Sequence, residues 1–423
     1  MINTLFHHQH RSFLKLWIAQ LISQFGDRIH QFALIALVHE RFPGSSLALA
    51  KLMACTIMPV FLIQPFAGVF VDRWDRRTTL FVCDVVRGGL VLLIPFFLMS
   101  ADSMWPIYGV VFLAFCFPRF HVPAKMAIIP DLVPEDSLLK ANSLITTTGL
   151  IAAVLGAACG AFLIEYFGAR NGFIIDSITF FVSALFVWNM AIPRQLKINK
   201  AQLQESVQKI KKSVWHEIRE GFDYIIKHKE IRFVIDMLFV LFMAAGSIYV
   251  LIVVFVQEAF QSVTRDVGVL AIFLVVGLFV GIMIYGKWGK RFSWYKTIFF
   301  CLILGGTMLS VFALLVQEYN NLTMAMGLAF FWGLTIGPIF VASNTVVHIV
   351  SDEEKRGQVF SALEIVINFA FLVAMFISSW LSNFVPKFSI LTVVGGLCAF
   401  VGLLGLTRSR DFQKLALDGG KMA

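Results

Sequence analysis

The chain has 423 residues, of which 58% are hydrophobic and 14% are charged. Its mean hydropathy of +0.81 excludes an ordinary soluble domain, whose core must be covered by a polar surface. The net charge of +9 does not indicate nucleic-acid binding, because the Lys and Arg residues gather in alternate loops between apolar runs. The composition therefore indicates a protein that faces lipid over most of its length.

Apolar runs of about 20 residues recur along the chain, and each is long enough to cross a hydrocarbon layer roughly 30 Å thick as a helix. The first run is full length and contains Asp27 and Arg28, so it differs from a cleaved signal peptide and should stay on the mature protein. The sequence thus predicts an all-α membrane protein with twelve transmembrane helices. The expected spans are residues 12–38, 47–71, 79–100, 104–124, 143–167, 171–192, 231–257, 265–288, 294–316, 320–347, 358–384 and 387–407.

One side of the first span is polar, because its polar residues recur at helical steps of three and four. The residues on this face or beside it are Gln20, Ser23, Gln24, Asp27, Arg28, His30 and Gln31. Counting about 1.5 Å per residue from Phe13 puts Asp27 about 21 Å along the helix, past the midplane. Ionisable groups at that depth are costly unless they face a cavity or a partner, so Asp27 is expected to face a cavity. It is interpreted either as a proton or cation carrier or, like Arg28, as a structural group satisfied by another helix.

Other ionisable residues fall inside later spans. Asp84 and Arg87 are separated by three residues in the third span and can pair there, and Arg119, at the end of the fourth span, is the nearest third member. They are interpreted as part of a cytoplasmic gate or as interfacial charges that reach water. In the eleventh span, Glu364 and Asn368 share a polar stripe, and Glu364 is the second candidate for a cavity carboxylate.

The longest connector follows the sixth span and divides the chain into residues 1–192, a connector at 193–230, and residues 231–423. The two parts repeat similar segments, such as 38–42 and 256–260, which indicates two six-helix pseudo-repeats with a site between them. Apolar residues at helical spacing predict an amphipathic cytoplasmic helix within the connector, or a solvated tether with a helical bias. Since the basic loops alternate, both termini and this connector are expected to be cytoplasmic.

The loop after the second span carries a family resemblance. Its sequence from 68 to 77 has a Gly, three residues, Asp-Arg and then a basic pair, at the positions Gly68, Asp72, Arg73, Arg76 and Arg77. This segment resembles the signature loop of the major facilitator superfamily, with Asp75 where that family usually has Gly. The resemblance implies that Asp72, together with the three arginines and the start of the eleventh span, forms a cytoplasmic gate. Alternatively, the arginines only set the topology.

The resemblance covers nearly the whole chain, including 20–37, 123–142, 173–184 and 217–222. These segments are similar to the branch with macrolide efflux pumps, the enterobactin exporter and the lysophospholipid transporter. That branch implies the major facilitator fold, the bacterial cytoplasmic (inner) membrane, and export or flipping of amphipathic compounds. Ala157 stands where the antiporter motif of the fifth span has a proline, while the small residues around it, including Gly156 and Gly160, predict close helix packing.

No cofactor, metal site or enzyme chemistry is expected. The chain has no Gly-Lys-Ser/Thr phosphate loop, its six cysteines are scattered singly, and no nucleophile is paired with a base. The leading hypothesis is a monomeric secondary exporter of an amphipathic small molecule, with protons as coupling ion. The alternatives are a lysophospholipid flippase or facilitator, and a membrane sensor or scaffold that transports nothing.

Overall fold

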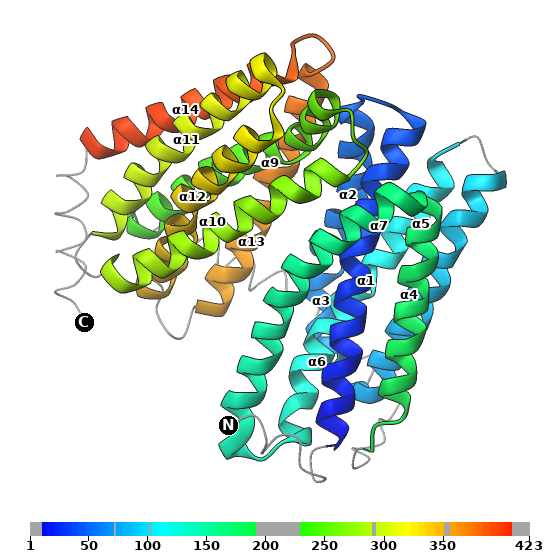
Figure 1. Cartoon of the computed structure of the whole chain (residues 1–423). Coiled ribbons are helices and arrows are strands. Elements are labelled where there is room, and N and C mark those ends of the chain that lie inside the picture. The colour runs from blue at the N-terminus through cyan, green and yellow to red at the C-terminus, as the bar shows by residue number, and fades with distance from the viewer. Residues whose placement is uncertain are drawn as a thin grey trace. The chain divides into compact units, whose positions relative to one another are not determined.

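The computed structural model describes residues 11–71, 73–100, 103–191, 229–289, 293–350 and 356–407 (Figure 1). Nearly all of these residues are helical, and none of them is in a strand. Ten segments are long and apolar enough to span a membrane. One of these ten segments, α7, contains two spans, and the more polar α1 adds a further one. The described residues therefore hold the twelve expected spans.

The helices form two compact units. The first is built from α1 to α7, and the second from α9 to α14 together with residues 42–50. The helices of the first unit are α1 (Arg11–Arg41), α2 (Ser46–Leu62), α3 (Gln64–Val71), α4 (Arg76–Ser100), α5 (Trp105–Cys116), α6 (Pro118–Leu132), the short 3₁₀ helix η2 (Glu135–Ser137) and α7 (Leu138–Trp188). Those of the second are α9 (Lys229–Phe260), α10 (Arg265–Trp288), α11 (Trp294–Tyr319), α12 (Leu322–Val350), α13 (Arg356–Leu381) and α14 (Lys387–Thr407).

Prolines and one glycine account for the interruptions inside the spans of the first unit. Pro65 and Pro118 stand in the first turns of α3 and α6, where a missing backbone N–H costs nothing, so the second and fourth spans are each split in two. The fourth span also continues to Leu132, past its expected end. In α7, Gly168 has φ of 77°, which a residue with a side chain rarely adopts, and it separates the fifth and sixth spans.

Small residues let α1 approach α7 closely. A Cβ added to Gly156 would lie 2.9 Å from Cγ of Arg28, and one added to Gly160 would lie 3.3 Å from Cα of Ile29. In the opposite direction, a Cβ on Gly26 would overlap the side chain of Thr179. The two helices therefore approach closely enough for polar side chains of α1 to reach those of α7.

The second unit uses the same device between other helices. Cβ atoms added to Gly277 or Gly281 of α10 would overlap backbone carbonyl oxygens of α12, and those added to Gly333 or Gly337 of α12 would press on the backbone of α10. The close packing is thus reciprocal along two turns. Glycine at these positions is required by the approach of one backbone to the other.

Several predictions concern residues outside the described part of the chain. They are the predicted amphipathic helix and domain boundaries in the 193–230 connector, the position of Asp72, and both terminal stretches. The last two residues of the connector belong to α9. The cytoplasmic placement of the termini stays a prediction.

Candidate functional site

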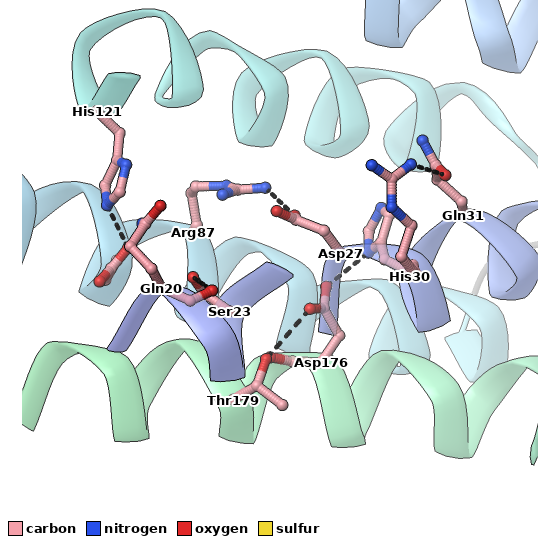
Figure 2. A network of polar contacts seen from close by, with 11 residues as sticks. Gln20, Ser23, Asp27, His30, Gln31, Arg87, His121, Asp176 and Thr179 are labelled. Carbon is pink, nitrogen blue, oxygen red and sulfur yellow. Dashed lines mark hydrogen bonds and ion pairs between the residues drawn. The ribbon is translucent and has the colours of Figure 1, made fainter. Parts of the chain in front are cut away.

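A network of polar and charged side chains lies inside the first unit (Figure 2). Its members come from α1, α4, α6 and the second half of α7, which pack side by side. Three carboxylates, Asp27, Asp84 and Asp176, each meet a basic side chain of a different helix. Since such groups are costly in an apolar bundle, this network is the candidate site.

Asp27 pairs with Arg87 of α4. The guanidinium Nη2 donates a hydrogen bond of 2.7 Å to Asp27 Oδ1, and its carbon lies 4.1 Å from the centre of the Phe180 ring. The Arg87 side chain is 9% exposed, whereas that of Asp27 is 39% exposed. The pair therefore has a buried cation and an open carboxylate.

Asp84 and Arg87 of α4 were expected to pair with each other, but each contacts a side chain of another helix instead. Asp84 Oδ2 instead accepts a hydrogen bond of 2.6 Å from the Ser183 hydroxyl, and Oδ1 lies 3.3 Å from Nε2 of His121. Both Asp84 and Arg87 are buried rather than interfacial. Arg119 does not join them as the expected third member, but donates to the side-chain oxygen of Gln64 in α3 at 3.1 Å.

His30 meets the third carboxylate, Asp176 of α7. Nδ1 of His30 lies 2.9 Å from Oδ2 of Asp176, and the two side chains are 4% and 1% exposed. The imidazole ring is enclosed by Phe115 and Phe173, whose ring centres lie 5.8 Å and 5.3 Å away. Asp176 is also contacted at Oδ1 by the hydroxyl of Thr179, at 3.4 Å.

The expected polar face of α1 divides into separate contacts. Gln20 Oε1 accepts hydrogen bonds from Lys125 of α6, at 2.7 Å, and from Gln24, at 3.1 Å. Farther along, Arg28 donates to Gln31 at 3.0 Å within the helix. These glutamines therefore have hydrogen-bond partners of their own.

The predicted gate residues contact neighbouring helices of the first unit. Arg76 donates to Asp131 Oδ2 at 2.7 Å and to the Ala127 carbonyl at 2.8 Å, both in α6. Arg77 donates to the carbonyl oxygen of Trp188 at the end of α7. Gly68 belongs to α3. The Arg73 N–H donates to the Phe70 carbonyl oxygen, and Asp75 accepts from the Thr78 N–H at the start of α4.

The candidates from the eleventh span belong to the second unit. Glu364 is exposed, and the side-chain amide of Asn368 donates to its backbone carbonyl at 2.8 Å, which is a local helical contact. Among the described residues, no group of three His, Cys, Asp or Glu side chains is arranged to hold a metal ion.

Sequence reasoning missed Asp176, His121, Lys125 and Ser183. Asp176 interrupts the otherwise apolar sixth span, and an ionisable residue within a span is itself a signal that could have identified it. His121 and Lys125 are one helical turn apart in the fourth span, so their shared side could also have been noticed.

Residues 3–350 match the family described as transmembrane secretion effector. Macrolide efflux protein A of Streptococcus pyogenes is 24% identical over 316 residues, which cover 72% of this chain and 74% of that one. The putative bacilysin exporter BacE of Bacillus subtilis is 24% identical over 346 residues, covering 79% and 81% of the two chains. A crystal structure of a bacterial homologue of the iron transporter ferroportin has a TM-score of 0.69 at 14% identity, over 93% of this chain and 98% of that one, which shows a shared fold.

Proposed function

The chain belongs to the transmembrane secretion effector family of major facilitator transporters, and we propose that it exports an amphipathic small molecule in exchange for protons. It is an integral membrane protein and a transporter rather than an enzyme. The names of two relatives, a macrolide efflux protein and a putative bacilysin exporter, support the outward direction. The proposal includes a monomer in the cytoplasmic membrane with both termini inside.

The ion pair between Asp27 and Arg87 is the observation that carries this proposal. Keeping Arg87 within an apolar bundle is costly, because burial removes water from its guanidinium group. Asp27 is the open member, so it can change partners while Arg87 stays buried. A carboxylate that alternates between a protein cation and another ligand can link substrate binding to a change in the charge of the network.

Alternating access would connect this switch to transport. In this mechanism the two six-helix halves rock about a site between them, and Asp72 with the neighbouring arginines holds the cytoplasmic side closed. Glu364 is the carboxylate of the second half that can contribute to the same cycle. The energy comes from the proton gradient, since protons enter as substrate leaves.

Flux measurements in proteoliposomes test the proposal. A radiolabelled macrolide is the first probe, after a thermal-shift screen that also includes catechol siderophores and lysophospholipids. In liposomes with an acidic lumen, molecules inserted inside out should accumulate the probe, and dissipating the pH difference should release it. Asp27→Asn should abolish this accumulation while the purified protein remains folded.

Glu364→Gln removes the other candidate carboxylate and is compared with Asp27→Asn in the same assay. Loss of accumulation in Glu364→Gln alone would move coupling to α13. If neither a pH difference nor a membrane potential drives accumulation of the probe, and lysophospholipid equilibrates rapidly, the protein is a flippase or facilitator and not an exporter.

A further inference from the structure

We propose that the buried His30–Asp176 pair holds the exchanged proton, and that Arg87 makes this proton and a cationic group bound at Asp27 mutually exclusive. The inference rests on the proposed exchange of substrate for protons and deepens it. It assigns the proton to a pair separate from the open carboxylate, and it assigns the substrate class as amphipathic amines.

The first step is the isolation of the pair from other hydrogen-bond partners. Nδ1 of His30 and Oδ2 of Asp176 lie 2.9 Å apart, so each has the other as its partner. Within the described part of the chain, the buried Nε2 of His30 has no hydrogen-bond partner. Polar atoms this deeply buried are almost always satisfied, so an exception at a titratable pair calls for a functional explanation.

The second step is the charge of the partner. A histidine balances a carboxylate only while it carries a proton, and it is the side chain that changes charge between about pH 5 and 8. With the proton bound, the His30–Asp176 pair is neutral overall. Without it, the pair leaves a negative charge in an apolar environment, which must attract another cation.

The third step identifies that cation as Arg87. The charged groups that act on Asp176 are His30 and Asp27 from α1 and Arg87 from α4. Arg87 in turn is within electrostatic range of Asp27, Asp176 and Asp84. The neighbours from α5 and α7 are the rings of Phe115 and Phe173 and the hydroxyl of Thr179, none of which supplies a cation.

These contacts define a competition of two carboxylates for one guanidinium. When His30 is protonated, Asp176 has its own cation and Arg87 pairs with Asp27, which is the arrangement in Figure 2. When an ammonium group of the substrate takes the open side of Asp27, Arg87 turns to Asp176 and His30 releases its proton to water. One proton is thus exchanged for one cation, and no net charge crosses for a monovalent amine.

The decisive measurement uses purified protein in weakly buffered detergent solution with a pH indicator. The probe is a radiolabelled macrolide that carries a tertiary amine. Wild type should release about one proton for each probe molecule bound, because binding of the probe and binding of the proton exclude each other. Binding without proton release by folded wild type would overturn the inference, whatever the variants do.

Variants separate the pair from the rest of the protein. His30→Gln and Asp176→Asn should still bind the probe and catalyse its counterflow, yet release no proton and show no pH-driven accumulation. His39→Gln is the matched control, since it removes another histidine of α1 outside the network and should keep both properties. Proton release by folded His30→Gln equal to that of wild type would also overturn the inference.

The test distinguishes this inference from the proposed function. If wild type shows no pH-driven accumulation of any probe, the exchange itself fails. If wild type accumulates probe and Asp27→Asn does not, while His30→Gln behaves as wild type, the exchange stands and the assignment of the proton to His30–Asp176 is wrong.

Discussion

Replacing Arg87 by methionine should damage the protein more than replacing its direct partner Asp27 by asparagine. Arg87 is buried and acts on three carboxylates, of which Asp84 and Asp176 are almost fully buried. Removing one member of a buried ion pair typically costs about 3–5 kcal/mol, because the other charge is left without a partner. We therefore expect the free energy of unfolding to fall by about 3–5 kcal/mol in Arg87→Met.

Asp27→Asn leaves Arg87 with two other carboxylates in electrostatic range, and Asp27 itself was already 39% exposed. Its cost should be nearer to that of one imperfect hydrogen bond, about 1–2 kcal/mol. The measurement is reversible unfolding of each variant in mixed micelles, titrated with a denaturing detergent. The double variant should be little worse than Arg87→Met alone, since the two groups share one interaction. An equal cost for Arg87→Met and Asp27→Asn would refute Arg87 as the shared counter-ion.

Three further predictions concern other parts of the chain. Asp72→Asn should slow transport and increase the cysteine accessibility of the cytoplasmic side, because the proposed gate loses a charge, and no change in either would leave Asp72 as a topology residue. Tags after Ala423 and within 197–212 should be cytoplasmic, and labelling of either from outside intact cells would reverse the predicted topology. Gly333→Leu should destabilise the second unit by about 1–3 kcal/mol, since its side chain would enter the backbone of α10. Gly327→Leu on the same helix is the control, because a Cβ there meets no atom within 4 Å, and equal stability of the two variants would contradict the packing.

The helices could be predicted from the sequence because the signal for a span is local. A run of apolar residues long enough to cross lipid identifies itself without knowledge of its neighbours, and the predicted start of α10 agrees with the structure at Arg265. Close packing at the fifth span was predictable for a related reason, although its partner α1 was not. Gly156 and Gly160 are small in any context, and small residues at helical spacing indicate close approach.

The pairing of charges could not be predicted in the same way, because it depends on which helices are neighbours. Spacing along α4 favoured a pair between Asp84 and Arg87, yet each of them bonds to a different helix. Asp176 has no basic residue within one helical turn in the sequence, so no local pattern gives its partner. Its contact with His30 exists only because Gly26 lets α1 approach the Asp176 turn of α7.

The distribution of charge between the two units suggests that duplicated halves have taken different roles. In the described part of the second unit, the charged side chain that is buried is Asp266, in the first turn of α10 beside the loop from α9. The first unit instead buries Asp84, Arg87 and Asp176 in the middle of its helices. Backbone contact between α10 and α12 leaves no room for side chains at the glycine positions where a similar network could be placed. Proton chemistry is therefore expected to belong to the first half.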